Sequence, residues 1–257
     1  MSTTPGFDTL AIHAGAAPDA ATGARVTPIY QTSSFVFDDV DHAASLFGLQ
    51  AFGNIYTRIT NPTNAVLEGR VAALEGGTAA LAVASGHAAE FLVFHTLLQP
   101  GDEFIASKKL YGGSINQFNH SFKSFGWNVV WADPDDIASF ERAVTPKTKA
   151  IVAVDIFGYP CELDPLIDIC ERHGLALVED ACEALGAKYK GKPLGAHGHP
   201  AVWAFYPNKQ ITTGEGGAVT TGDEEQYKLL VSLRNQGRLE TSSWLQHGRF
   251  GFNYRMD

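Results

Sequence analysis

Two side chains of complementary chemistry follow apolar runs of the chain, and they give the first indication of its function. The run at residues 201–206 leads to Lys209, and a glycine-rich turn follows at residues 214–217. The run at residues 175–178 leads to Asp180. Pyridoxal 5'-phosphate requires an amine for its aldehyde and a carboxylate for its protonated ring nitrogen. A solvated loop lysine and a helix-capping aspartate would have the same spacing.

Two further features suit a phosphorylated aromatic ligand. Ser85, Gly86 and His87 lie where a strand-like run gives way to a helix-like pattern. The free N–H groups and the positive dipole end of a helix start favour a phosphate dianion, although an ordinary serine N-cap explains the same residues. Tyr111 offers a flat face that could stack on a pyridine ring, and a core aromatic residue at a helix start is the alternative.

Alternating elements must position these side chains. Asn61 and Pro62 open a helix that ends at Gly76. From there strand-like runs alternate with amphipathic segments, which predicts a three-layer α/β/α fold with a mostly parallel sheet. The predicted strands are residues 78–84, 104–106, 128–131, 150–154, 175–178, 202–205 and 218–221, and the predicted helices are residues 62–75, 86–98, 163–173 and 223–235.

The carboxyl ends of such strands are where ligands bind in an open α/β sheet. The Ser85-Gly86 turn, Tyr111, Asp180 and Lys209 each follow a predicted strand or open the helix after one. We therefore expect these side chains to meet in one site.

The first 60 residues differ from the rest of the chain. They have little periodicity and many Gly, Pro, Thr and Ala residues, which predicts an irregular arm that packs on a second subunit. Without repeats or low-complexity linkers, residues 61–257 are expected to form one domain.

Composition limits the partners. The net charge of −9 argues against nucleic acid and anionic membranes, and we find no apolar run of membrane-spanning length and no signal peptide. The three cysteines are an odd number without metal-ligand spacing, and the nine histidines show no paired spacing. We expect reduced thiols in a cytoplasmic protein without a metal site.

Residues 152–257 resemble the DegT/DnrJ/EryC1/StrS sugar aminotransferases. The resemblance implies that Asp180 pairs with the pyridine nitrogen of the cofactor and that Lys209 binds its aldehyde covalently. Glu183 stands where the family usually has glutamine, and some relatives share the glutamate. The matching stretches are residues 155–160, 179–187, 205–217, 233–238 and 251–257.

Residues 7–150 resemble a different family, the O-acetylhomoserine sulfhydrylases of the Cys/Met-metabolism group. This resemblance implies that Tyr111 stacks on the pyridine ring and that the turn at Ser85, Gly86 and His87 holds the phosphate. It also implies that Tyr56 and Arg58 reach the cofactor phosphate of a neighbouring subunit, so a homodimer or homotetramer is expected. The matching stretches are residues 7–15, 28–35, 56–63, 84–89 and 111–114.

Both families have fold type I of the pyridoxal-phosphate enzymes, so the chain resembles a hybrid of two large-domain halves. Both continue into a C-terminal small domain, which in the sulfhydrylases carries the arginine that binds the substrate carboxylate. We expect that domain to be absent, because the chain ends at Asp257.

Three functions remain open from the sequence. The first is a sulfhydrylase of methionine biosynthesis, with acetate elimination and sulfur addition on a cofactor-bound amino acid and Lys209 as the base. The second is a nucleotide-sugar aminotransferase that uses glutamate as amino donor. The third is a cofactor-binding fragment without turnover.

Overall fold

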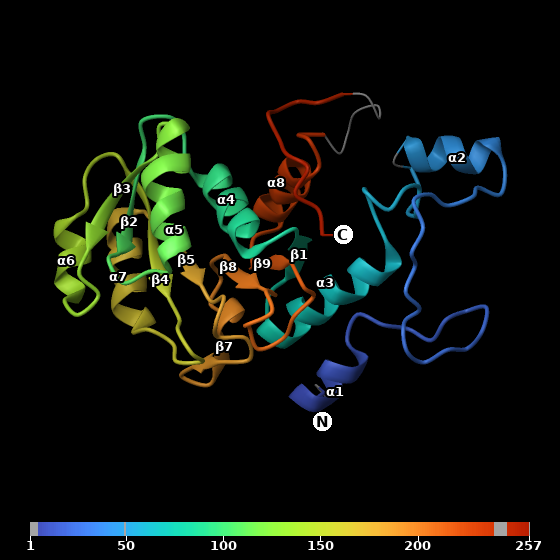
Figure 1. The fold of residues 1–257 in the computed structure, drawn as a ribbon, viewed down its shortest axis with the longest axis horizontal. Helices are drawn as coiled ribbons and strands as arrows, with labels where there is room; N and C mark the ends of the chain where they lie inside the picture. The colour runs from blue at the N-terminus through green and yellow to red at the C-terminus, as the bar shows by residue number, and fades with distance from the viewer. Residues whose placement is uncertain (1–4, 49, 239–245, 257) are drawn as a thin grey trace.

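A seven-stranded sheet forms the centre of the fold (Figure 1), which is taken from a computed structural model that describes residues 5–48, 50–238 and 246–256. Only β9 runs antiparallel to its neighbours, so the predicted mostly parallel sheet is confirmed. From one edge to the other the strands are β1 (Ala79–Val83), β9 (Gly217–Thr221), β8 (Ala201–Ala204), β5 (Ala176–Asp180), β4 (Thr148–Val154), β2 (Glu103–Ser107) and β3 (Asn128–Ala132).

Helices cover both faces of this sheet, so the expected three-layer α/β/α architecture is confirmed. Among the described residues, no helix combines the length and the apolar character needed to cross a membrane. One face is covered by α3 (Pro62–Glu75), α6 (Ile137–Arg142) and α7 (Leu163–His173). The other is covered by α4 (Gly86–Leu97), by α5 (Gly112–Asn116) with its π-helical extension (Gln117–Phe122), and by α8 (Glu224–Arg234).

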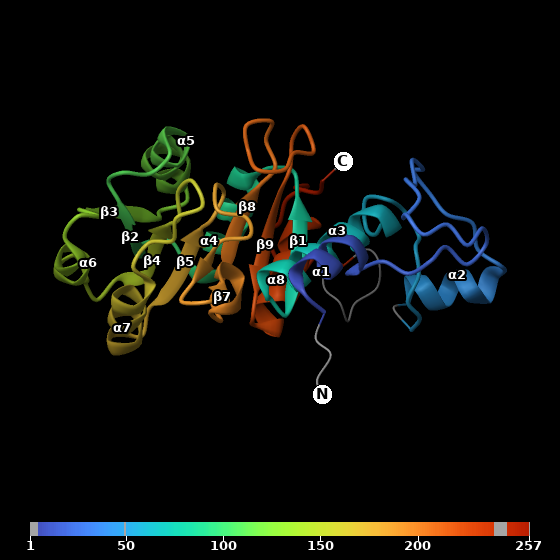
Figure 2. The same cartoon turned by 90° about the horizontal axis from the view of Figure 1, so that it is seen from below.

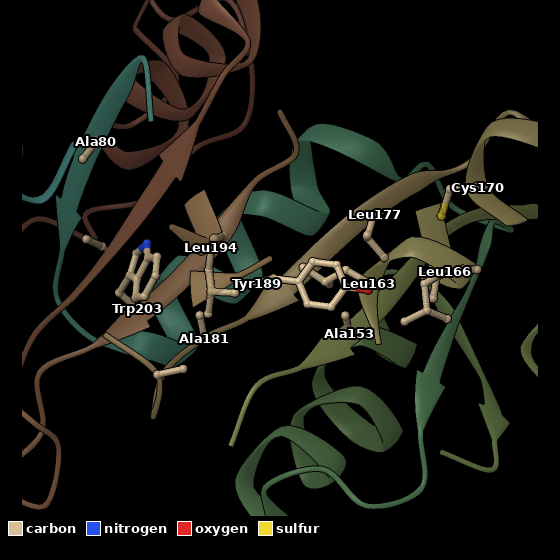
Figure 3. Close-up of a cluster of buried hydrophobic side chains, with 14 of the residues drawn as sticks. Ala80, Ala153, Leu163, Leu166, Cys170, Leu177, Ala181, Tyr189, Leu194 and Trp203 are labelled. Atoms are coloured by element: carbon tan, nitrogen blue, oxygen red, sulfur yellow. The ribbon is translucent and has the colours of Figure 1, made fainter. Parts of the chain in front are cut away.

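Each face of the sheet has its own apolar core. Figure 3 shows part of the first core, where Leu163 lies beside Tyr189 of the short hairpin formed by β6 (Lys188–Tyr189) and β7 (Lys192–Pro193), and Leu194 lies between Tyr189 and Trp203. The indole N–H of Trp203 donates to Thr220 Oγ1 at 2.9 Å, which satisfies its polar atom. The opposite core is rich in aromatic rings that fix α4 against the sheet: Phe91, Phe94, Phe104, Phe118, Phe122 and Trp127.

Local signals set the helix ends where the sequence predicts them. The Asn61 side chain accepts the Thr63 N–H at 2.8 Å and caps α3, which ends at Gly76 in the left-handed conformation with φ of 73°. The predicted strands and helices agree with the observed ones to within about three residues at their ends. The prediction did not include α5, its π-helical extension, α6 or the β6–β7 hairpin, which are short.

The arm at residues 5–60 extends away from the sheet (Figures 1 and 2). It contains two short helices that the sequence did not indicate, α1 (Phe7–His13) and α2 (Val40–Phe47). Arg70 of α3 holds the end of α1 against α3, because its guanidinium donates hydrogen bonds to the backbone oxygens of Ala14 and Ile12, each at 3.1 Å. Beyond α1 the arm exposes a series of large apolar side chains: Val26, Ile29, Val36, Val40 and Phe52.

Candidate active site

A cavity of about 470 Å³ lies at the carboxyl ends of the parallel strands. It is bordered by β8, by the end of β5 and by the start of α4, so residues distant in sequence meet there. The structure thus brings together most of the residues selected from the sequence. Those that line the cavity are Ser85, Gly86, His87, Tyr111, Asp180, Glu183 and Lys209.

Lys209 supplies an amine to this cavity. It follows β8 through a tight turn, in which its N–H donates to the Tyr206 carbonyl at 2.9 Å. The side chain is only 14% exposed, and its Nζ lies 3.0 Å from Glu183 Oε1 and 6.0 Å from the centroid of the Tyr111 ring. Lys109 also borders the cavity, but its ammonium is paired with Asp135 at the surface.

Asp180 is the last residue of β5 and is buried beneath the cavity. Its Oδ1 accepts the Cys182 N–H at 3.2 Å. Burial raises the pKa of Asp180, while the hydrogen bonds from Cys182 and the charges of Lys209 and His87 oppose that rise. A buried carboxylate is stable only with a cationic partner, and a protonated pyridine nitrogen above Asp180 would provide one.

The start of α4 offers backbone donors on the same cavity. Ser85 Oγ accepts the Ala88 N–H at 3.1 Å, which leaves the N–H groups of Gly86 and His87 without an intrahelical acceptor. A Cβ on Gly86 would lie 2.8 Å from the Ala204 Cβ, so only glycine allows this close approach of α4 to β8. The glycine keeps the helix start accessible to an anion.

Tyr111 and His87 form a stacked pair beside these donors. Their ring centroids are 5.7 Å apart with an interplanar angle of 28°. Tyr111 remains 69% exposed, so it presents aromatic surface to a ligand, which argues against a role as a core residue. Burial lowers the pKa of His87, and the charge of Asp180 opposes that shift.

Glu90 is a site residue that the sequence analysis missed. It lies on α4, is fully buried and borders the cavity. Neither carboxyl oxygen makes a well-aligned hydrogen bond in the part of the chain that the structure describes, although the Ser114 side chain acts on the group and opposes the rise in its pKa. Burial, followed by the nearby charge of Asp180, raises its pKa well above the usual value. The only signal in the sequence is one acidic residue within the apolar run of that helix.

These groups fit pyridoxal 5'-phosphate in kind and in arrangement. The cavity joins an amine on Lys209, a buried carboxylate on Asp180, backbone donors at the start of α4 and the aromatic face of Tyr111. They correspond in turn to the aldehyde, the ring nitrogen, the phosphate and the ring face of the cofactor.

Tyr56 and Arg58 do not line this cavity. They lie in the arm, where the Arg58 guanidinium is 5.2 Å from the centroid of the Tyr56 ring. The charge of Arg58 acts instead on Arg255, whose pKa is lowered to about 10 by burial and by the neighbouring charges of Arg58, Arg234 and Arg238. Their role toward another subunit's cofactor stays a prediction.

Comparison with known families gives one match that covers most of the chain. Residues 51–257 match the model of the DegT/DnrJ/EryC1/StrS aminotransferase family. The matched region begins within the arm and includes every residue that lines the cavity.

The curated relatives come from a second group of enzymes. An O-acetyl-L-homoserine sulfhydrylase of Leptospira meyeri is 51% identical over 200 residues, which cover 76% of this chain and 44% of that protein. O-acetyl-L-homoserine sulfhydrylase 1 of Thermus thermophilus is 44% identical over 192 residues, which cover 73% of this chain and 45% of that protein. The chain therefore spans less than half the length of these relatives.

Solved structures of other proteins share the fold. MetB from Corynebacterium glutamicum superposes with a TM-score of 0.77 at 28% identity, over 91% of this chain and 59% of that one. A putative O-acetylhomoserine (thiol)-lyase from Campylobacter jejuni, solved with a pyridoxyl-lysine, gives 0.74 at 31% identity, over 90% and 55%. DesV from S. venezuelae gives 0.68 at 33% identity, over 77% and 54%. The family match spans residues 51–257, and the alignment with the Leptospira meyeri enzyme spans 200 residues. Since the two lengths add up to more than the 257 residues of the chain, the two matched regions overlap.

Proposed function

Because the chain belongs to the DegT/DnrJ/EryC1/StrS aminotransferase family, we propose that it works as a transferase of the O-acetylhomoserine sulfhydrylase type. Its fold is fold type I of the pyridoxal-phosphate enzymes, and its cofactor is pyridoxal 5'-phosphate. The observation that carries the proposal is the meeting of the Lys209 amine, the Asp180 carboxylate and the start of α4 in one cavity. The sulfhydrylase assignment is supported by the 51% identity to the Leptospira meyeri enzyme.

The site residues selected from the sequence would have distinct parts in holding the cofactor. In this proposal Lys209 binds the aldehyde, and Asp180 keeps the ring nitrogen protonated. The N–H groups of Gly86 and His87 bind the phosphate, with the Ser85 cap holding the helix start in shape. Tyr111 covers one face of the ring.

The reacting carbon atoms are those of an amino-acid substrate. When bound, pyridoxal phosphate withdraws electrons and stabilises negative charge next to the substrate amine. Lys209 would remove protons at the α and β carbons as acetate leaves the γ carbon, and after a sulfur nucleophile adds at the γ carbon it would return protons to the β and α carbons. Glu183, at 3.0 Å from Lys209 Nζ, holds the amine over the Tyr111 ring for these transfers.

A nucleotide-sugar aminotransferase is the second candidate. The family match over residues 51–257 favours it, because that match includes Asp180, Glu183 and Lys209. The two functions share the cofactor residues and differ in substrate, since glutamate would donate its amino group to a keto-sugar.

One titration distinguishes the candidates. The purified chain is saturated with pyridoxal 5'-phosphate, and its absorbance is followed after addition of O-acetylhomoserine with sulfide, or of glutamate. Acetate release with consumption of sulfide supports the sulfhydrylase, and 2-oxoglutarate formation supports the aminotransferase. If borohydride fixes the cofactor to Lys209 but neither product forms, the chain is a cofactor-binding fragment.

We also propose a homodimer or homotetramer in which residues 1–60 form an inter-subunit arm and residues 61–257 form the cofactor-binding domain. The exposed apolar side chains of the arm, such as Val36 and Phe52, support a protein partner. The positive cluster of Arg58, Arg238 and Arg255 supports an anion at that surface, for which the partner's cofactor phosphate is suited. Three free cysteines agree with a cytoplasmic location.

A further inference from the structure

Two buried carboxyl groups lie side by side at the carboxyl ends of β4 and β5. Asp155, which is 1% exposed, directly follows β4 and borders the cavity, and Glu179 in β5 is 0% exposed. One oxygen of each has a clear partner: Asp155 Oδ1 accepts the Cys161 N–H at 2.8 Å, and Glu179 Oε1 is hydrogen-bonded to His199 Nε2. The other two oxygens, Oδ2 of Asp155 and Oε2 of Glu179, make no well-aligned hydrogen bond among the described residues, and the Cys161 thiol is a weak donor beside Asp155.

Two negative charges cannot remain adjacent in such a place. Burial and the charge of Glu179 raise the pKa of Asp155 to about 8, and burial raises that of Glu179 to about 8. The hydrogen bond between the two carboxyl groups raises the pKa of Asp155 and lowers that of Glu179. One proton shared by the two carboxyl groups removes the repulsion between them.

We propose that Asp155 carries a proton on Oδ2 and donates it to Oε2 of Glu179, and that this shared proton holds the strand end that presents Asp180. The single proton gives both unpaired oxygens a partner. Glu179 directly precedes Asp180, and the Asp155 N–H donates to the Asp180 carbonyl at 3.0 Å. The pair is a positioning device, because it acts on the cofactor only through Asp180.

Three other titratable groups among the described residues face the pair: His199, Glu75, whose own pKa burial raises to about 7, and Cys161, whose thiol hydrogen-bonds to Asp155. His199, which precedes β8, has its pKa lowered to about 4 by burial, so a neutral ring donates its Nε2–H to Glu179. Glu75 of α3 adds a negative influence on Glu179, and it accepts the Gly186 N–H at 2.7 Å. Burial raises the pKa of the Cys161 thiol, which stays neutral.

The shared proton makes the free energy of unfolding depend on pH. In the unfolded chain both carboxyl groups ionise near pH 4, whereas the folded pair keeps its proton up to about pH 8. Stability is therefore fully present below the unfolded pKa and falls as pH rises toward the folded pKa. For one proton, the unfolding equilibrium constant increases about tenfold per pH unit between the unfolded and the folded pKa. Above the folded pKa it no longer changes with pH.

The first test compares the full chain with Asp155→Asn in urea unfolding across about pH 5 to pH 9. The asparagine amide donates to Glu179 Oε2, and its carbonyl accepts the Cys161 N–H, so the contacts persist without a titrating proton. Up to about pH 8, we expect the free energy of unfolding of the variant to fall less steeply with pH than that of the wild type, by the slope that corresponds to one proton. Asp168→Asn, in an exposed pair with Arg172, is the control and should keep the wild-type slope. An unchanged slope in Asp155→Asn would overturn the proposal.

Two further measurements keep the proposal testable if Asp155→Asn does not fold. Glu179→Gln removes the same proton and should lose the same slope. In unbuffered solution near neutral pH, unfolding of the wild-type chain should release about one proton more than unfolding of Glu179→Gln, and an equal release from both would contradict the shared proton.

The positioning role has its own readout, the affinity for pyridoxal 5'-phosphate followed by absorbance. Asp155→Ala breaks the contacts with Glu179 and Cys161, so we expect the dissociation constant to rise by roughly tenfold. Asp155→Asn should restore it to within about threefold of the wild-type value. Equal affinities in the alanine variant and the wild type would refute the positioning role, even if the shared proton itself is confirmed.

Discussion

Lys209 Nζ lies 3.0 Å from Glu183 Oε1, although 26 residues separate the two along the chain. The contact joins the turn after β8 to the loop after β5, and so it links the amine to the strand that carries Asp180. It also keeps the amine near the Tyr111 ring. Because this lysine is held inside the cavity, its reaction with an aldehyde should be specific among the lysines of the protein.

We predict that pyridoxal 5'-phosphate forms a yellow adduct that borohydride fixes to Lys209. Lys209→Ala should abolish the adduct, and it should lower the unfolding midpoint because it leaves Glu183 without its partner and removes a positive charge near Asp180. Peptide mapping after reduction locates the modified residue. Lys109→Ala is the matched control, since Lys109 borders the cavity but pairs with Asp135. Modification of Lys109 in the wild-type protein would exclude the assigned role of Lys209.

Asp180→Ala should weaken cofactor binding strongly. The substitution removes the buried carboxylate expected to face the ring nitrogen, a loss of about 2–4 kcal/mol, or roughly 30- to 1000-fold in dissociation constant. Absorbance titration with pyridoxal 5'-phosphate measures it. Asp164→Ala, which removes an exposed partner of Lys190, should bind like the wild type. If both variants bind equally well, Asp180 is not the counter-ion.

Gly86→Ala should disturb the start of α4. The added Cβ would lie 2.8 Å from the Ala204 Cβ and 3.3 Å from the Cys182 Sγ, so the helix must shift. We expect a loss of about 1–3 kcal/mol in the free energy of unfolding together with weaker phosphate binding, measured by urea unfolding and cofactor titration. Gly112→Ala is the control, because no atom lies within 4 Å of its Cβ position. If Gly86→Ala changes neither the free energy of unfolding nor the cofactor affinity, α4 can move away from β8 without destabilising the protein.

Glu90→Gln should stabilise the protein more at alkaline than at acidic pH. Burial and the charge of Asp180 raise the pKa of Glu90, so the folded state favours the protonated form. Wild-type stability is present below the unfolded pKa of about 4 and declines as pH rises toward the folded value. Glutamine does not titrate, so the melting temperature of the variant should exceed that of the wild type increasingly with pH. A constant difference in melting temperature at every pH would rule out this titration.

A mixture of Lys209→Ala and Arg58→Ala chains should recover cofactor adduct formation that neither variant shows alone. If Arg58 serves the partner's site, one site of each mixed dimer has both residues intact. After random exchange about one quarter of all sites are restored, as measured by reduced adduct per chain. The control mixture joins Lys209→Ala with Asp180→Ala. In that mixture both substitutions affect the chain's own cavity, so a mixed dimer gains no complete site. If neither mixture recovers adduct formation, Arg58 does not contribute to the partner's site.

The sequence by itself determined the alternation of strands and helices and the residues that close them. Asn61, Gly76 and Ser85 act through local hydrogen bonds and backbone conformation, so their effect on α3 and α4 is readable from neighbouring residues. Because ligands bind at the carboxyl ends of the strands in such sheets, the sequence also predicted one common site for four residues. These are Ser85, Tyr111, Asp180 and Lys209. Short elements such as α1 and α6 escaped prediction, because fewer than two turns of helix leave little periodicity.

Only the tertiary structure decided how charges are buried and paired. Glu90, Asp155 and Glu179 are ordinary acidic residues in the sequence, and their protonation depends on which groups the fold places beside them. Neighbouring parallel strands β4 and β5 bring Asp155 against Glu179, and α4 carries Glu90 to Asp180. Burial penalises charge only once the surrounding chain excludes water. Most of the residues selected from the sequence therefore line the cavity, whereas the protonation of its buried carboxyl groups depends on the fold.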